Sequence, residues 1–217
     1  MNLDLGEYAD VDAPVRDVSA PRAVVETSVL HEGHIFDLVT DTVDLGRSVV
    51  HRDYVDHPGA VAIIALDEAD RVLLIKQYRH AVRRELWEPP AGLLDSPGEP
   101  AQQAAARELA EETDLIAGSW HVLADYYTTP GASNEAVRIF LARDFSFVPL
   151  ADRHVREDEE AEISVRWVPL DEAVTAVLGG DIHNPSAVAG VLAAAASRAG
   201  GWTSLRPADA PWPERRA

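Results

Sequence analysis

Two stretches decide the fold: GLLDSPGE at residues 92–99 and, seven residues later, RELAEETDL at residues 107–115. Residues 100–112 are rich in Ala, Gln, Arg, Leu and Glu, begin with a proline and contain no glycine, which predicts a helix. On a helix with 3.6 residues per turn, Glu108, Glu111 and Glu112 share one face, because residues three and four apart are neighbours. The segment therefore predicts a helix that carries a row of carboxylates.

Clustered carboxylates repel one another, so their grouping favours a site for hard divalent cations. Mg²⁺ takes oxygen ligands and normally keeps water and substrate phosphates as the rest of its shell. A solvated helix face is the alternative for a Glu-rich stretch. Arg107 lies four residues before Glu111 and eight after Glu99, where it can anchor either carboxylate. Gly92 permits a close approach that a side chain would block.

This pattern resembles the box of the Nudix hydrolases, Gly-x5-Glu-x7-Arg-Glu-U-x-Glu-Glu-x-Gly-U, in which U is a bulky aliphatic residue. Residues 99–115 match its spacing, with two departures nearby. Six residues rather than five separate Gly92 from Glu99, and the extra one falls in the loop 95–98, where an insertion costs little. The second glycine is Asp114, and Asp is one of the few other residues that adopt a left-handed helix cap at modest cost. Neither departure alters a carboxylate that is expected to bind metal, so we expect the hydrolase activity to be retained.

Outside the box, residues 30–195 look most like the ADP-ribose pyrophosphatase branch of that family. The branch has a proline about fifteen residues past the box, and here Pro130 stands fifteen after Leu115. QYR at 77–79 and WEPPAG at 87–92 are also similar to the branch. The resemblance implies an α/β fold, namely a Nudix-type α/β/α sandwich of mixed sheet with a small N-terminal β-sheet unit.

The implied reaction is hydrolysis of the pyrophosphate of ADP-ribose, or a related ADP-sugar, to AMP and ribose 5-phosphate. The resemblance also implies a metal cofactor, Mg²⁺ or alternatively Mn²⁺, with two or more ions in each site. The expected metal ligands are Glu108, Glu111, Glu112 and the backbone carbonyl of Ala91, and Arg107 and Glu111 are expected to take part in catalysis.

The resemblance places the general base in the acidic loop 156–162, with Glu159 as first choice and Glu160 as second. A solvated acidic loop is the alternative for this segment. A general base must lie within hydrogen-bond reach of the attacking water.

Five residues are expected to contact substrate. Arg79 is the candidate for the phosphates, Glu135 for the terminal ribose, and Gly131 belongs to the substrate loop 129–135. Phe36 can stack on the adenine, with Arg52 on its other face or edge. Each residue also has a purely structural alternative. Arg79 and Arg52 can be solvated surface charges, Phe36 can belong to the hydrophobic core, and Gly131 can be part of a plain turn.

The composition narrows the functional classes. The chain has 217 residues, with 19 Lys+Arg against 37 Asp+Glu and a net charge of −18, which argues against broad binding to nucleic acid or anionic membranes. It has no cysteine, which excludes disulfides, thiolate zinc sites and cysteine nucleophiles. Neither a signal peptide nor an apolar run of the ~20 residues that span a membrane is visible. We expect a soluble cytoplasmic enzyme acting on a small nucleotide sugar.

Four regions are expected along the chain. They are a flexible lead-in at 1–20, an N-terminal β unit at 21–57, a catalytic domain at 58–205 and a flexible tail at 206–217 that contains three prolines. By resemblance, the β unit pairs two chains in a homodimer and supplies the adenine site. Strands are expected as a meander at 24–30, 34–43 and 48–55, as a hairpin at 60–66 and 72–78, and at 120–127, 136–142 and 163–168; two further helices are expected at 171–178 and 186–199.

Two other functions stay open at this point. One is a Nudix hydrolase of a nucleoside triphosphate or of another nucleoside diphosphate sugar. The other is a catalytically silent domain that binds ADP-ribose, against which the complete set of carboxylates argues.

Overall fold

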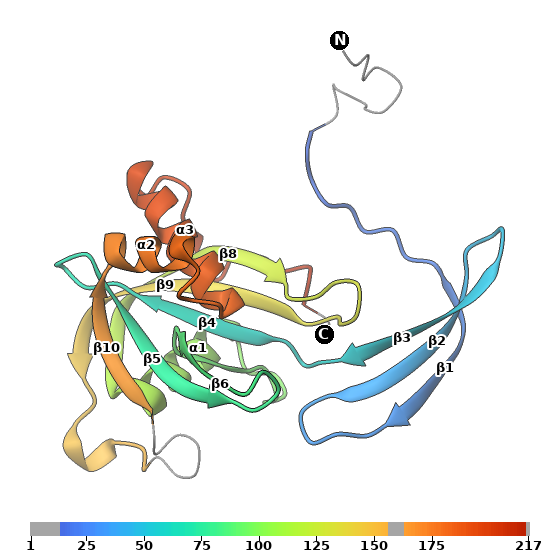
Figure 1. Cartoon of the computed structure of the whole chain (residues 1–217), viewed down its shortest axis with the longest axis horizontal. Helices are drawn as coiled ribbons and strands as arrows, with labels where there is room; N and C mark the ends of the chain where they lie inside the picture. Colours follow the sequence, from blue (N-terminus) through green and yellow to red (C-terminus); the bar gives the residue numbers. More distant parts are fainter. Residues whose placement is uncertain (1–13, 156–162, 216–217) are drawn as a thin grey trace.

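The computed structural model describes residues 14–155 and 163–215 of the chain, and Figure 1 shows the arrangement of its elements. The three α-helices of this part are α1 (Ala101–Thr113), α2 (Leu170–Gly179) and α3 (Pro185–Ala199). The strands are β1 (Ala23–His31), β2 (Asp37–Asp44), β3 (Val49–Asp56), β4 (Ala60–Ala65), β5 (Arg71–Arg79), β6 (Arg84–Glu88), β7 (Ala91–Leu93), β8 (Leu115–Tyr127), β9 (Ala136–Phe147), β10 (Ser164–Pro169) and β11 (Arg206–Pro207).

The N-terminal unit is an antiparallel sheet in the order β1-β2-β3, as the predicted meander requires. It extends away from the rest of the molecule in Figure 1. All nine residues of β1 are exposed, and Val39 is the one buried residue of β2. The unit therefore has almost no core of its own within a single chain.

The central sheet has the order β11-β8-β9-β4-β7, with β4 parallel to β9 and the other pairs antiparallel. A second sheet has the order β10-β5-β6. Strand β4 is buried on both faces: Ala62 and Ile64 point into one core cluster, while Val61 and Ile63 point into the other. Helices α2 and α3 line the first cluster and α1 lines the second, so the expected α/β/α sandwich with a mixed sheet is confirmed.

The predicted hairpin of β4 and β5 is wrong. Both strands form where expected, but they belong to different sheets and share only the isolated bridge Leu66↔Val72. Because β4 is apolar on both faces, it takes a central position between β9 and β7. The turn at residues 67–71 then carries the chain from one sheet to the other.

The C-terminal segment also differs from the expected flexible tail. Its described part, residues 206–215, begins with β11, which pairs with β8 through Arg206↔Val122 and Pro207↔His121. Arg138, only 2% exposed, donates from Nη1 to the carbonyl of Ala210 at 2.7 Å and from Nη2 to that of Pro211 at 3.1 Å. The segment is therefore held in place, because the carbonyls of Ala210 and Pro211 accept hydrogen bonds from a buried cation. No helix in the described part of the chain is long and apolar enough to cross a membrane.

Candidate active site

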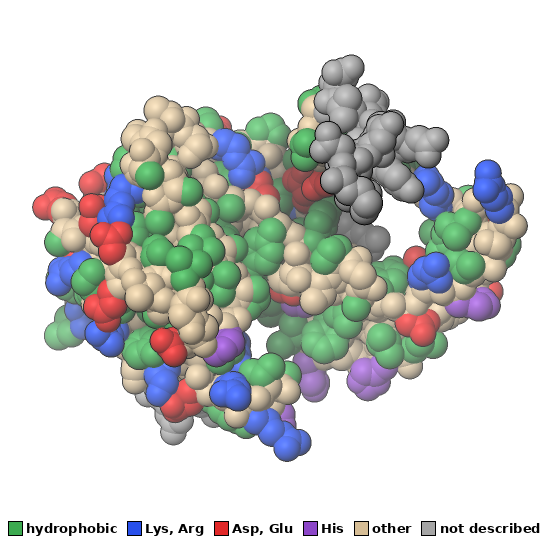
Figure 2. All heavy atoms as spheres, turned by 45° about the horizontal axis from the view of Figure 1, so that its top comes forward, with side chains coloured by type: hydrophobic (Ala, Val, Ile, Leu, Met, Phe, Trp, Pro, Cys, Tyr) green, Lys and Arg blue, Asp and Glu red, His purple; other side chains and the backbone are tan. Residues whose placement is uncertain are grey.

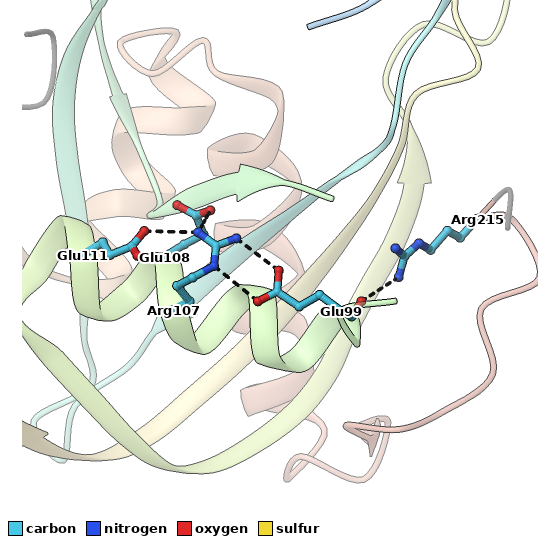
Figure 3. A network of polar contacts seen from close by, with 5 residues as sticks. All are labelled: Glu99, Arg107, Glu108, Glu111 and Arg215. Atoms are coloured by element: carbon cyan, nitrogen blue, oxygen red, sulfur yellow. Dashed lines mark hydrogen bonds and ion pairs between the residues drawn. The ribbon is translucent and has the colours of Figure 1, made fainter. Parts of the chain in front are cut away.

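Arg107 is the centre of a carboxylate network on α1 (Figure 3). Its guanidinium donates to Glu99 at 3.2 and 3.3 Å, to Glu108 at 2.7 Å and to Glu111 at 3.1 Å. The hydrogen bonds to Glu99 and the negative charge of Glu108 raise the pKa of Arg107 further above its usual range, against the opposing effect of burial. The sequence allowed either Glu99 or Glu111 as the partner of Arg107, and in the structure Arg107 binds both.

Glu108 and Glu112 lie one turn apart and reach neighbouring residues of β7. A β-carbon at Gly92 would lie 2.2 Å from Oε1 of Glu108, so this carboxylate occupies the space that glycine leaves. The backbone N–H of Ala91 donates to Oε2 of Glu112 at 3.0 Å, and Glu112 is only 6% exposed. The two side chains are thus fixed against the strand that precedes the helix.

These groups suit a hard divalent ion chemically, because they are carboxylate oxygens gathered beside a backbone segment. In the described ranges 14–155 and 163–215, however, no three His, Asp or Glu side chains are arranged to hold an ion directly. The contacts above explain this arrangement: Glu108 and Glu111 accept hydrogen bonds from Arg107, and Glu112 accepts one from Ala91. The donor set fits a divalent metal, whereas its present geometry is that of a hydrogen-bonded network.

The left-handed cap expected at Asp114 is confirmed. Asp114 ends α1 with φ 58° and ψ 26°, and its N–H donates to the carbonyl of Ala110 at 3.0 Å. Its own carbonyl accepts from the N–H of Val148, and its carboxylate lies 3.7 Å from Arg153. Residues 95–98, where the extra residue of the box is expected, lie in the loop between β7 and α1.

Arg79 forms a double hydrogen bond with a residue that the sequence did not single out. Its Nε donates to Glu88 at 2.9 and 3.1 Å, and its Nη2 donates to the same carboxylate at 2.6 Å. Glu88 is 1% exposed, whereas the Arg79 side chain is 45% exposed. Arg79 is therefore held in one orientation by a buried carboxylate at the end of β6. The sequence signal that could have identified Glu88 is its position directly before Pro89-Pro90.

The predicted substrate loop is bound to the end of β3. The N–H of Val55 donates to the carbonyl of Ala132 at 2.9 Å, and Asn134 bridges back through its side chain to the N–H of His57 at 2.8 Å and to Asp56. Glu135 accepts from the hydroxyl of Thr128 at 2.7 Å, which closes the base of the loop. Asn134 was missed because its partners are about eighty positions away in the sequence.

Comparisons with known proteins now identify the family. The family profile of the NUDIX domain matches residues 56–188. The chain belongs to the Nudix family. It is 45% identical to an ADP-ribose pyrophosphatase of Mycobacterium tuberculosis (strain ATCC 25618 / H37Rv), over 88% of this chain and 91% of that protein. It is 34% identical to an ADP-ribose pyrophosphatase of Bacillus subtilis (strain 168), over 71% and 82% of the two chains.

A solved structure supports the Nudix fold independently. The crystal structure of an ADP compounds hydrolase matches 86% of this chain and 98% of its own, with a TM-score of 0.69. The two sequences are only 20% identical, so this likeness concerns the fold alone.

Three further expected site residues of this Nudix chain line two cavities. Gly131 and Arg52 line one of 390 Å³ between β3 and the loop 130–134. Phe36 lines another of 700 Å³, opposite the loop 94–98, and is 47% exposed rather than part of the core. Phe36 and Arg52 thus line two different cavities of the described part of the chain. Glu159 and Glu160 lie outside the described residues.

Proposed function

We propose that this Nudix protein hydrolyses the pyrophosphate bond of ADP-ribose, or of a related ADP-sugar, to AMP and ribose 5-phosphate. The observation that carries the proposal is the complete set of box carboxylates: Glu108 and Glu112 are fixed against β7, and Arg107 binds Glu99, Glu108 and Glu111. The two relatives named ADP-ribose pyrophosphatase support this choice of substrate.

The proposed cofactor is Mg²⁺, with Mn²⁺ as an alternative, at two or more ions. Glu108, Glu111, Glu112 and the carbonyl of Ala91 would hold them. When bound, such ions neutralise the pyrophosphate and lower the pKa of the attacking water. Arg107 fixes the direction of two of these carboxylates, and the Ala91 N–H fixes a third.

The proposed substrate contacts follow the position of each side chain. Arg79 would bind the phosphates, because Glu88 holds its guanidinium in place and about half of its side chain is exposed. Glu135 would accept hydrogen bonds from the terminal ribose beside Gly131. Phe36 and Arg52 would enclose the adenine. Glu159 is the proposed general base, and comparing Glu159→Gln with Glu160→Gln tests that assignment.

A homodimer is part of the proposal. The β1–β3 unit carries many exposed apolar side chains, and Figure 2 shows such side chains on its surface. They include Val24, Val25, Val29, Leu30, Ile35, Phe36, Leu38 and Val49. Exposed apolar patches on a soluble protein mark interaction sites. Pairing through this unit would also allow Phe36 of one chain to meet Arg52 of the other.

Light scattering tests the dimer. A mass near 47 kDa, about twice the 23.6 kDa of the chain, is expected. A monomer would remove the basis for the shared adenine site. A cytoplasmic location belongs to the same proposal and is testable by cell fractionation.

A substrate panel tests the reaction itself. kcat/KM is measured with Mg²⁺ for ADP-ribose, other ADP-sugars, GDP- and UDP-sugars and nucleoside triphosphates. The proposal requires the ADP compounds to rank first. Preference for another base or for a triphosphate would reassign the substrate within the Nudix family, and binding of ADP-ribose without turnover would identify a silent binding domain.

A further inference from the structure

The C-terminal segment 206–215 is bound to the body of the protein by charged side chains that the proposed reaction does not use. Arg206 donates to Asp125 at 2.8 Å. Arg138 donates to the same carboxylate at 2.8 and 3.0 Å, and its guanidinium lies 4.7 Å from the ring centre of Trp212. Trp212 also packs against the core cluster that α1 covers. The segment is therefore attached at several points along its length.

Arg138 determines where this segment runs. A guanidinium has five N–H donors, and burying it without partners is costly. Asp125 satisfies one edge of the Arg138 guanidinium, and the carbonyls of Ala210 and Pro211 satisfy the other. The C-terminal segment thus supplies the acceptors that the buried guanidinium of Arg138 requires. These hydrogen bonds fix the path of the segment over the body of the protein.

The segment ends at the loop that precedes α1. Arg215 donates from Nη1 to the backbone carbonyl of Glu99 at 3.4 Å, and Figure 3 shows it approaching Glu99 from the side opposite Arg107. Arg215 also lines the 700 Å³ cavity beside residues 94–98. Glu99 is thus contacted at its backbone by the C-terminal segment and at its carboxylate by Arg107.

We propose that Arg215 is a positioning residue for the carboxylate box. It holds the backbone of Glu99, Glu99 holds Arg107, and Arg107 directs Glu108 and Glu111. Arg215 is not a metal ligand in this scheme, so it acts on the metal site through Glu99. The inference rests on the proposed metal site and connects it to the C-terminal segment.

Direct Mn²⁺ binding tests the proposal, measured by electron paramagnetic resonance on full-length metal-free protein. In Arg215→Ala we expect the Kd for Mn²⁺ to rise about 3- to 10-fold, less than the ~10- to 100-fold typical of groups bonded directly to metal ligands. The Mg²⁺ concentration that gives half-maximal activity should rise in parallel, with little change in Tm, because the anchor at Arg138 is intact. Arg215→Lys retains a cationic donor and should recover most of the affinity.

Glu214→Gln is the matched control, since it changes a neighbouring side chain for which the described contacts include no partner on the box. It should bind Mn²⁺ like the wild type. An unchanged Kd in Arg215→Ala, or an equal loss in Glu214→Gln, would overturn the inference. If the wild type itself binds no Mn²⁺, the proposed metal site fails instead, and the two failures are therefore distinguishable.

Discussion

A β-carbon at Gly92 would lie 2.0 Å from the carboxyl carbon of Glu108. Heavy atoms that are not bonded cannot approach so closely, so any other residue here must displace the Glu108 carboxylate. The glycine of the box is required by the space that this carboxylate occupies beside β7, one residue from the amide that binds Glu112.

Gly92→Ala should therefore impair catalysis more than folding. The new methyl group displaces the Glu108 carboxylate from its present position, and a misplacement of about 1 Å at a reactive site can cost about 100-fold in rate. We expect a loss of that order in kcat with ADP-ribose and little change in Tm. The control is Gly179→Ala at the end of α2, where the nearest atom would lie at 3.6 Å, an ordinary contact. Equal kinetics for wild type and Gly92→Ala would contradict this interpretation.

Glu112→Gln separates the charge of this residue from its structural hydrogen bond. The amide oxygen of glutamine can still accept from the N–H of Ala91, so the protein should fold normally. Loss of the negative charge should lower kcat/KM at least about 100-fold, since even groups that only orient metal ligands contribute about 10- to 100-fold. Thermal unfolding and steady-state kinetics check both expectations. Glu68→Gln in the exposed turn 67–71 should change neither, and substantial activity in Glu112→Gln would remove this residue from the metal set.

The Arg79–Glu88 pair gives a prediction for stability as well as binding. Arg79→Ala leaves the carboxylate of Glu88 buried without this partner, which should cost about 2–3 kcal/mol, less than the ~3–5 kcal/mol of a fully buried pair because Arg79 is partly exposed. Its KM for ADP-ribose should also rise.

The double variant Arg79→Ala/Glu88→Gln distinguishes these two effects. Removing the charge of Glu88 should recover part of the stability in urea unfolding, whereas KM should stay high because the phosphate contact is still missing. Recovery of KM together with stability would show that Arg79 has a structural role only.

Asp114 should tolerate one substitution and reject another. Its φ of 58° lies in the left-handed region, so Asp114→Gly should change the free energy of unfolding and the activity only slightly. Asp114→Val should destabilise by about 1–2 kcal/mol, since side chains with a branched β-carbon fit this conformation poorly. Urea unfolding of both variants measures the difference, and similar destabilisation by Gly and Val would refute the steric explanation.

Local chemistry accounts for the parts of the fold that the sequence predicts well. The helix at α1, its cap at Asp114 and the contact between Arg107 and Glu99 depend on residues a few positions apart, where spacing fixes geometry. Residues 60–66 form an apolar run, which predicts a strand but not its partners, because the pairing of β4 with β9 joins residues more than seventy positions apart. That is why a hairpin was predicted for β4 and β5.

Side chains satisfied by distant backbone are the second class of feature that local patterns miss. Arg138 reads as an ordinary strand residue, yet its burial organises the C-terminal segment through carbonyls more than seventy residues away. Three prolines predict a loose C-terminal segment, and no local pattern shows that the carbonyls of Ala210 and Pro211 bind a buried guanidinium. Glu88 differs from Arg138, because its partner Arg79 is a side chain only nine positions away, but its burial at 1% exposure is not marked by any local pattern.

The most direct test of the proposed function is the formation of AMP and ribose 5-phosphate from ADP-ribose, followed by chromatography with Mg²⁺ for wild type and Glu112→Gln. We predict stoichiometric release of both products by the wild type, its abolition by EDTA, and a nearly inactive variant. An intact ADP-ribose peak with the wild type, or equal turnover by Glu112→Gln, would contradict the proposal.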